Sequence, residues 1–289
     1  MTHGRKPAAP AAPVDRAVSA LSGGAGAASC FIFRGHQLLV SAAGGLPAAA
    51  RRHLGALPPL RVFEFLGHTG EPCLVAELAR ECEPPPGHRF EHLKALLDTL
   101  PAATRSAAAR ALELLEFDRT HRFCGSCGAP TALATQPIAR RCTNPDCGRE
   151  HYPRVSPVVI VAVERGEEIL LGRSPHFPPG LYSTLAGFVD AGESAEQAVH
   201  REIHEETRLQ VRNLRYFASQ PWPFPHSLML GYQAEYAGGD IVCAPAEIED
   251  ARFFHVDALP AVFPMRYAMA NQLLQDFCRR HGRAWPPAG

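Results

Sequence analysis

The stretch GFVDAGESAEQAVHREIHEETRL, residues 187–209, decides the fold. Within it, Ser194 followed by Gln197 fits a capping box, which predicts that a helix begins there. An apolar stripe at helical spacing follows, formed by Ala195, Ala198, Val199 and Ile203. Because such a stripe faces a core, we expect an amphipathic helix packed against the body of a domain.

Three carboxylates crowd the end of this predicted helix. At about 100° per residue, Glu202, Glu205 and Glu206 fall within one arc of roughly 100° on the helix surface. Like charges at this spacing repel one another and destabilise a helix. One interpretation is a solvated acidic face balanced by Arg201 and Arg208. The other is a site for a cation, since a cation would relieve the repulsion.

The wider spacing favours the cation site. Gly187, Glu193 and the run from Arg201 onward resemble the Nudix box, G-x5-E-x7-R-E-U-x-E-E-x-G-U, in which U is a bulky aliphatic residue. Every position matches, with Leu209 as the last aliphatic residue, except that Arg208 stands where the family has glycine. If this position ends the helix with a positive φ, Arg208 costs about 1 kcal/mol that glycine would not.

The resemblance implies a metal-dependent diphosphatase. Hard divalent cations prefer oxygen ligands and are often held by a few carboxylates together with substrate phosphates. In the family, the box glutamates hold Mg²⁺ or Mn²⁺ against a diphosphate, and water attacks one phosphorus. By that resemblance, Glu202 and Glu206 are metal ligands and Glu205 is a ligand or the base that orients water. Arg201 would hold the loop carboxylate of Glu193 in place.

The composition is that of an ordinary globular protein. The chain has 289 residues, with 29 basic and 29 acidic side chains, so neither a general nucleic-acid surface nor a membrane-attracting surface is indicated. No apolar run approaches the roughly 20 residues that span a bilayer. Residues 1–28 are rich in Ala, Pro and Gly and lack the apolar centre of a secretory signal, so we expect a flexible tail, with a transit peptide as the alternative. We therefore expect a cytoplasmic protein.

A second motif is a pair of cysteine pairs. C-x2-C and C-x4-C are separated by 14 residues and comprise Cys124, Cys127, Cys142 and Cys147. This spacing suits two knuckles that clasp one tetrahedral, structural Zn²⁺ per chain, and buried or redox-active thiols are the alternative. His121 and His151 lie near enough in sequence to replace a ligand. The remaining five cysteines are scattered and are expected to be packing residues.

The order of patterns along the chain predicts three domains after the tail. Short strand-like runs and then helical patterns indicate an α/β N-terminal domain over 29–118, followed by the zinc module over 120–153. The apolar run at 157–163 opens the last domain, 154–289, in which strands and helices alternate. A mixed sheet between helices is therefore expected. This agrees with the α/β/α sandwich that the Nudix resemblance implies.

Specificity is indicated by a stretch beyond the acidic helix. In residues 219–227, SQPWPFPHS, three prolines alternate with two large aromatic residues. Because proline fixes φ, the segment is stiff, and its aromatic rings offer a wall suited to flat bases. An edge strand that only covers the core is the alternative. The run resembles the mark of the NADH pyrophosphatase branch of the Nudix family, and the zinc module fits the same branch. The resemblance implies hydrolysis of NADH to reduced nicotinamide mononucleotide and AMP by a homodimer.

The resemblance also carries over individual positions. Expected substrate contacts are Tyr152, Phe188, Gln220, Pro221, Trp222, Pro223, Phe224, Pro225, His226, Ser227 and Ala270. The carbonyl of Ala186 and the carboxylate of Glu247 would join the metal ligands. Because Glu249 and Asp250 stand beside Glu247, the choice among these three acids stays open in the sequence.

Three rival functions compete with NADH hydrolysis. A different Nudix substrate, such as ADP-ribose or a nucleoside triphosphate, is disfavoured by the aromatic run at 222–227. Removal of NAD caps from RNA would use the same bond and the same pocket. A nucleic-acid-binding or scaffolding protein with an inactive Nudix domain is disfavoured because the costly carboxylate array is intact. NAD⁺, NADH and NAD-capped RNA remain alternatives.

Overall fold

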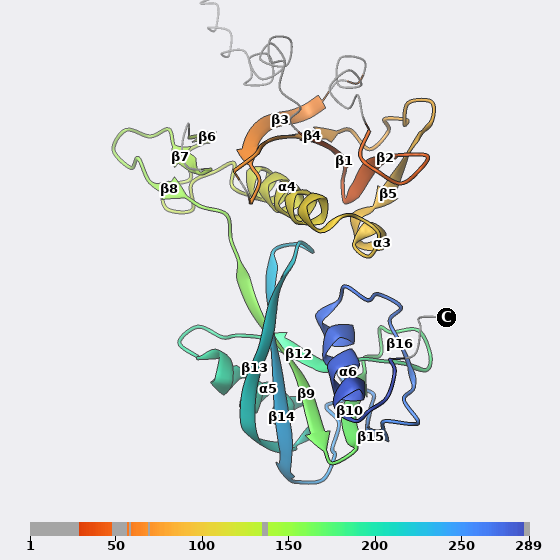
Figure 1. Cartoon of the computed structure of the whole chain (residues 1–289). Helices are drawn as coiled ribbons and strands as arrows, with labels where there is room; N and C mark the ends of the chain where they lie inside the picture. Colours follow the sequence, from red (N-terminus) through yellow and green to blue (C-terminus); the bar gives the residue numbers. More distant parts are fainter. Residues whose placement is uncertain (1–28, 48–56, 58, 69, 135–137, 286–289) are drawn as a thin grey trace, which may run out of the picture. The chain divides into compact units, whose positions relative to one another are not determined.

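The computed structural model describes most of the chain in two compact units, Met1–Pro153 and Arg154–Gly289 (Figure 1). The described stretches are 29–47, 57, 59–68, 70–134 and 138–285. The predicted flexible tail, residues 1–28, lies outside the described residues. No helix in the described part of the chain is long and apolar enough to cross a membrane.

The second unit is built on a mixed sheet with the strand order β13-β14-β9-β10-β15, and β12 also pairs with β9. Its strands are β9 (Ser156–Arg165), β10 (Glu168–Arg173), β12 (Leu185–Phe188), β13 (Gln210–Trp222), β14 (Ser227–Gly238) and β15 (Asp250–His255). β14 and β9 run parallel, and the other pairs are antiparallel. A small second sheet pairs β11 (Leu181–Tyr182) with β16 (Ala261–Val262).

Two helices cover opposite faces of this sheet (Figure 1). α5 (Ala195–Thr207) packs on a core that includes Val159 and Val161 of β9. α6 (Met269–Arg280) packs on a separate core that includes Ile160 of the same strand. Successive residues of a strand point to opposite faces, so a continuously apolar strand serves both cores. The expected α/β/α sandwich with a mixed sheet is confirmed.

The ends of α5 follow from its sequence. Ser194 accepts a hydrogen bond from the backbone N–H of Gln197, and the Gln197 side chain accepts one from the Ser194 N–H, so the predicted capping box is present. The helix ends at Arg208, which adopts a left-handed conformation with φ of 62°. This is the position at which the family pattern has glycine. The departure from the pattern therefore costs about 1 kcal/mol without moving the helix end.

The first unit contains a five-stranded sheet in the order β3-β4-β1-β2-β5. Its strands are β1 (Ser29–Arg34), β2 (Gln37–Ser41), β3 (Pro59–Leu66), β4 (Pro72–Leu78) and β5 (His88–His92). The short strand-like runs of this region form the antiparallel pairs β1–β2 and β3–β4. The sequence did not predict β5, because HRFEH has no apolar run. This edge strand is held by backbone pairing with β2.

Two helices and the cysteine module complete the first unit. α3 (Leu93–Leu96) is a single turn, whereas α4 (Ala102–Thr120) is long and packs on β1 and β4. The cysteine module forms a three-stranded sheet of β6 (Thr131–Leu133), β7 (Arg140–Cys142) and β8 (Glu150–His151). It belongs to the same compact unit as the N-terminal sheet.

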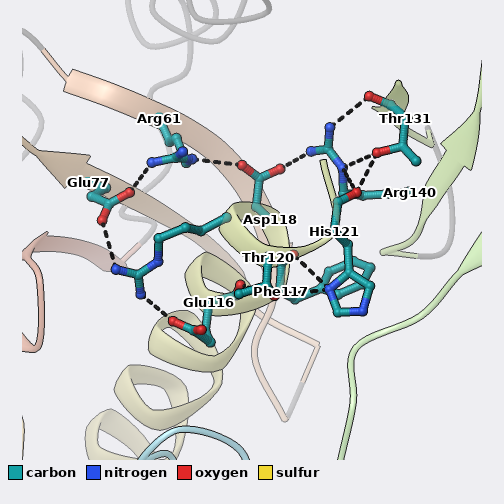
Figure 2. Close-up of polar contacts among 10 residues, drawn as sticks. Arg61, Glu77, Glu116, Phe117, Asp118, Thr120, His121, Thr131 and Arg140 are labelled. Carbon is teal, nitrogen blue, oxygen red and sulfur yellow. Dashed lines mark hydrogen bonds and ion pairs between the residues drawn. The ribbon is translucent and has the colours of Figure 1, made fainter. Parts of the chain in front are cut away.

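A network of ion pairs joins the cysteine module, called the ribbon from here on, to the N-terminal domain (Figure 2). Asp118, near the end of α4, accepts hydrogen bonds from Arg61 of β3 and from Arg140 of β7. Arg140 also donates to the carbonyl oxygens of His121 and Thr131, at 3.1 and 2.8 Å. Asp118 is 8% exposed, so the carboxylate is shielded from water and depends on both arginines. This buried carboxylate ties three elements of the unit together.

Candidate active site

The box carboxylates lie on α5 beside β12. A Cβ atom built on Gly187 would meet the Glu202 carboxyl carbon at 1.9 Å, so glycine leaves room for this carboxylate where it lies, and a larger residue would displace it. Glu206 is 6% exposed, whereas the side chain of Glu205 is 54% exposed. Two of the three glutamates are therefore withdrawn from water against the strand that carries Ala186, and the third faces solvent.

Glu206 is the most perturbed acid of the group. Burial raises its pKa to about 8, and the negative charges of Glu202, Glu247 and Glu205 add to the effect. Its Oε2 atom is buried without a hydrogen-bond partner among the described residues. Burial likewise raises the pKa of Glu202, with contributions from Glu205 and Glu247, although Arg201 opposes the shift. Buried carboxylates that lack partners are costly, and a divalent cation would supply the missing charge.

Arg201 organises the loop and the helix. Its guanidinium donates two hydrogen bonds to Glu193, at 2.9 and 2.8 Å, which is the bidentate geometry of a strong pair. It also donates to the carbonyl oxygen of Phe188 at 2.8 Å and to Glu202 and Glu205 at 2.9 Å each. The hydrogen bonds from Arg201 lower the pKa of Glu193, so that carboxylate stays charged. The expected pairing of Arg201 with Glu193 is present in the structure.

The structure separates the three acids between which the sequence left a choice. Glu249 forms an ion pair with Arg173 at 2.7 Å, and Asp250 accepts hydrogen bonds from Arg252. The Glu247 carboxylate has no hydrogen-bond or ion-pair partner among the described residues. Its charge nevertheless raises the pKa values of both buried box glutamates, and the loop that carries it is joined to α5 by the Ala244 N–H, which donates to the Glu206 carbonyl oxygen at 3.0 Å. Glu247 is therefore the one of these three acids whose carboxylate pairs with none of the described residues.

The donor set fits a hard divalent cation. Glu202, Glu206 and Glu247 would supply carboxylate oxygens to such an ion, and the strand residue Ala186, next to Gly187, would add a backbone carbonyl. Mg²⁺ and Mn²⁺ prefer such oxygen donors. The unpartnered buried oxygen of Glu206 is the observation that supports this fit.

Two of the expected substrate contacts lie in the row of the sheet next to Gly187. Phe188 of β12 pairs with Val158 of β9, which pairs with Met229 of β14, which pairs with Gln220 of β13. Phe188 and Gln220 therefore occupy one row across four strands. Gly187, which accommodates the Glu202 carboxylate, is one residue before Phe188. The strand register thus places the row of Phe188 and Gln220 next to the row of Gly187, with the side chains of the two rows on opposite faces of the sheet.

The aromatic wall is the turn between β13 and β14. Trp222 and Phe224 pack edge to face with ring centroids 5.3 Å apart. Pro223 is buried, whereas Pro221 and Pro225 are exposed.

The turn is also anchored to the start of β9. The backbone N–H of Ser156 donates to the carbonyl oxygen of His226 at 2.9 Å, and its hydroxyl lies 3.2 Å from the His226 ring. Ser227, the first residue of β14, is buried. The end of the turn is therefore fixed to β9, as a preformed wall would require.

Gln220 and Ala270 have a structural relation that the sequence did not reveal. Gln220 is 3% exposed, and its side chain donates to the carbonyl oxygen of Tyr267 and accepts from the N–H of Met269. Both partners lie at the start of α6, next to Ala270. The Gln220 amide thus ties the wall strand to α6. Backbone partners distant in sequence leave no local pattern, so sequence reasoning missed Tyr267 and Met269.

Tyr152 and Phe188 are both exposed aromatic residues, at 54% and 57%. Phe188 is part of the site in the second unit through its carbonyl oxygen, which Arg201 holds. Tyr152 belongs to the first unit, where its hydroxyl donates to Glu150 at 2.7 Å. Its predicted contact with substrate therefore stays a prediction.

The four cysteines of the ribbon converge on one point. Their Sγ atoms all lie within 4.8 Å of one another, in the group Cys124, Cys127, Cys142 and Cys147. The Cys124–Cys147 and Cys127–Cys142 sulfur distances are 3.8 and 3.5 Å. Four sulfurs at about 2.3 Å from a tetrahedral Zn²⁺ would be about 3.8 Å apart, so the arrangement fits this ion. Such a site offers no open coordination position and is structural.

Three family models match consecutive parts of the chain. They are an NADH pyrophosphatase-like rudimentary NUDIX domain over 27–116, an NADH pyrophosphatase zinc ribbon domain over 119–152 and a NUDIX domain over 153–275. The chain belongs to the Nudix hydrolase family. Its combination of domains is that of the zinc-ribbon-containing NADH pyrophosphatase branch, which confirms the resemblance seen in the sequence.

Similar curated proteins cover most of the chain. The NAD-capped RNA hydrolase NudC of Chromobacterium violaceum is 49% identical, over 78% of this chain and 86% of that protein. The protein of the same name from Stutzerimonas stutzeri is 48% identical, over 79% of this chain and 82% of that protein. The one from Deinococcus radiodurans is 44% identical, over 85% of this chain and 86% of that protein.

Proposed function

We propose that this protein hydrolyses the diphosphate bond of NADH and NAD⁺, producing nicotinamide mononucleotide and AMP. The observation that carries the proposal is the group of three acids at α5, Glu202, Glu206 and Glu247, with its unpartnered buried oxygen. An array that costs stability requires a compensating ligand, and a metal-bound diphosphate provides one.

The residues of this array and around it have three proposed roles: metal binding, orientation of the attacking water, and positioning of the loop. When bound, Mg²⁺ or Mn²⁺ supplies positive charge that offsets the charge of the diphosphate. Glu202, Glu206, Glu247 and the Ala186 carbonyl hold the ion. Glu205 is solvent-facing, which supports a role in orienting the attacking water or as a further ligand. Arg201, on the helix, holds the loop in place through its two hydrogen bonds to Glu193.

The aromatic turn supports a dinucleotide as the substrate. Trp222 and Phe224 offer flat faces to a nicotinamide or adenine ring, and base stacking on aromatic side chains is worth about 1 to 3 kcal/mol per base. Pro221, Pro223 and Pro225 stiffen this turn, so little entropy is lost when a ring binds. His226, Ser227, Gln220, Ala270, Phe188 and Tyr152 complete the proposed contacts.

A second substrate is favoured by the comparisons. Relatives that are 44% to 49% identical carry the name NAD-capped RNA hydrolase. Removal of an NAD cap breaks the same bond, with an RNA chain extending from the adenosine end of the dinucleotide. We therefore include NAD-capped RNA as an alternative physiological substrate of the same site.

The assembly, the location, the catalytic ion and the domain bounds are proposed from the resemblance to the family. The protein acts as a homodimer in the cytoplasm, and Mg²⁺ or Mn²⁺ is its catalytic ion. Its domains are an α/β domain over 29–118, the zinc ribbon over 120–153 and the Nudix domain over 154–289. A mass measurement in solution by multi-angle light scattering tests the assembly, with about twice the 31.3 kDa chain mass expected.

Product analysis tests the activity. The full chain is incubated with Mg²⁺ or Mn²⁺ and, separately, NADH, NAD⁺, ADP-ribose or NAD-capped RNA, and the products are separated by chromatography. We expect AMP and reduced nicotinamide mononucleotide from NADH, and cap removal that leaves a 5′-monophosphate on RNA. Faster cleavage of ADP-ribose than of every NAD-containing substrate would contradict the proposed specificity. No cleavage of any substrate would contradict the proposed function.

A further inference from the structure

The loop that carries Glu247 is held against the sheet by the three residues that follow Glu247. Ile248 is 6% exposed and packs in the core on the α5 side of the sheet. A Cβ atom on Gly172 would lie 3.3 Å from the Ile248 side chain, so this glycine of β10 makes room for it. The backbone after Glu247 is therefore inserted into the core at a defined place.

The next residue is fixed by an arginine. The backbone N–H of Glu249 donates to the carbonyl oxygen of Arg173 at 2.9 Å, and the Arg173 guanidinium pairs with the Glu249 carboxylate at 2.7 Å. The Arg173 side chain is 14% exposed, so this pair is better shielded than an ordinary surface ion pair. Arg173 is the last residue of β10, and its pairing partner in β15 is Asp250.

The third residue is fixed from another strand. Asp250 accepts a hydrogen bond from the hydroxyl group of Tyr182 in β11. On the other side of Glu247, the backbone N–H of Ala244 donates to the carbonyl oxygen of Glu206 itself at 3.0 Å, and the N–H of Glu247 donates to the Ala244 carbonyl at 3.0 Å. The loop is thus joined to α5 before Glu247 and to the sheet after it.

We propose that Arg173 is a positioning residue for metal binding: by holding Glu249, it keeps the Glu247 carboxylate beside Glu202 and Glu206. This inference rests on the proposed diphosphatase site and deepens it. Arg173 itself touches neither metal nor substrate. Without Arg173, the loop is still fixed by Ile248 in the core and by Asp250, so the fold survives. The Glu247 side chain becomes more mobile, and metal binding then has to restrict this extra motion. Residues that orient metal ligands change metal affinity by about 10- to 100-fold in other sites.

The experiment measures Mn²⁺ binding without substrate, by the loss of the free-ion signal in electron paramagnetic resonance. The variants are Arg173→Gln, Glu249→Gln and the double variant. We expect each single variant to bind Mn²⁺ about tenfold more weakly, and the double variant to bind no more weakly than either single one, because both remove the same pair. Arg165→Gln is the matched control, since Arg165 forms a 2.9 Å ion pair with Glu168 at the β9–β10 turn.

The outcomes separate the positioning role from structural damage and from the proposed activity. Glu249 is 39% exposed at its side chain, so Glu249→Gln keeps the test available if Arg173→Gln does not fold. A folded Glu249→Gln protein with wild-type Mn²⁺ affinity would overturn the inference. Additive losses in the double variant would overturn it as well. Failure of the wild type to hydrolyse dinucleotides, with Mn²⁺ binding still dependent on Arg173, would contradict the proposed function and leave the positioning role standing.

Discussion

In the N-terminal sheet the strands follow the order β3-β4-β1-β2-β5, and in the Nudix sheet they follow β13-β14-β9-β10-β15. The directions also agree: β4 and β1 are parallel, as are β14 and β9, and the remaining neighbours are antiparallel in both sheets. In each unit a helix comes after the last strand of the five in sequence: α4 after β5, and α6 after β15. The family model for a rudimentary NUDIX domain matches this first sheet.

The two regions differ in the connection between the second and third strands of this shared topology. In the Nudix domain, residues 174–209 contain β12, the Glu193 loop and α5 with its glutamates. In the N-terminal domain, the shorter segment 42–58 contains no Asp or Glu at all. The comparison indicates that the sheet is a scaffold and that most of the proposed metal ligands come from one inserted connection, to which the loop between β14 and β15 adds Glu247. A rudimentary copy can keep the scaffold because strand pairing and core packing do not need the carboxylates.

The largest expected effect comes from the inserted connection. Glu206→Gln removes a charge with little change in volume, and loss of a direct metal ligand should cost several kcal/mol of transition-state stabilisation, about a thousandfold or more in kcat. Steady-state kinetics with NADH measures this loss. Glu196→Gln, on the same helix but outside the carboxylate array, is the control and should stay near wild type. A folded Glu206→Gln protein with normal turnover would show that the inserted helix is not the catalytic element.

The next effect concerns the first unit, in which the acids are structural. Asp118→Asn leaves Arg61 and Arg140 without their shared carboxylate (Figure 2) and should cost about 3 kcal/mol, or roughly 6–12 °C in the melting temperature of that unit. The loosened ribbon should also release Zn²⁺ faster to a chromophoric chelator. Glu91→Gln, which removes an exposed pair with Arg89, should cost less than about 1 kcal/mol. Equal melting of both variants would contradict the anchoring role of Asp118.

A third effect tests the aromatic wall. Trp222→Ala should remove stacking worth about 1 to 3 kcal/mol, which lowers kcat/KM for NADH by about 5- to 150-fold. Most of the loss should appear in KM, because a ring distant from the reacting phosphorus changes little during the reaction. Mn²⁺ affinity and the melting temperature serve as controls and should change little. An unchanged kcat/KM in the folded variant would mean that the turn only covers the core.

The pH dependence of stability gives a fourth, smaller effect. Burial, followed by the charges of Glu202, Glu247 and Glu205, raises the pKa of Glu206 to about 8 from the ordinary glutamate value of 4.5. The folded state therefore binds this proton more tightly than the unfolded state. Protonation of Glu206 therefore favours the folded state. Without Mg²⁺ or Mn²⁺, this contribution to the free energy of unfolding is fully present below pH 4.5 and is lost as the pH rises towards 8.

Melting curves of the wild type and Glu206→Gln in buffer freed of both ions measure this effect. The variant should become more stable relative to the wild type by on the order of 2 kcal/mol between pH 5 and pH 8. Excess Mg²⁺ should reverse the difference, because it stabilises only the intact site. A difference that does not change with pH would contradict the raised pKa.

The smallest effect is at the end of the box helix. Arg208→Gly should stabilise the protein by about 1 kcal/mol or less, since glycine adopts the φ of 62° without strain but gains more entropy in the unfolded chain. Differential scanning calorimetry resolves the expected rise of a few degrees. Asn213→Gly is the matched control, because Asn213 also has a positive φ, 54°, which asparagine tolerates better. A lower melting temperature for Arg208→Gly than for Asn213→Gly would contradict this interpretation.

Local patterns in the sequence were enough to predict the catalytic helix. Its capping box, apolar stripe and left-handed end all depend on residues within one short segment. The apolar run of β9 and the spacing of the four cysteines were equally local, so strand and zinc site could be predicted as well.

Features that depend on distant partners could not be predicted in the same way. The β5 strand has no apolar run and forms only by pairing with β2. The hydrogen bonds that hold the Gln220 amide at the start of α6 join residues more than 40 positions apart and leave no local pattern. The pairing of Arg173 with Glu249 joins residues far apart in the chain, so nothing in the sequence distinguished Glu247 from its acidic neighbours. The shared order of the two sheets also became visible only in three dimensions.

The most direct test of the central claim is the position of the catalytic ion. Crystals of the zinc-containing protein, soaked with Mn²⁺, are measured on both sides of the manganese absorption edge. The account predicts one or more manganese peaks among Glu202, Glu206 and Glu247 on the Nudix sheet, none in the N-terminal sheet, and a separate zinc peak among the four cysteines. Manganese bound elsewhere, with no peak at these three glutamates, would contradict the claim that the inserted connection and Glu247 together hold the metal.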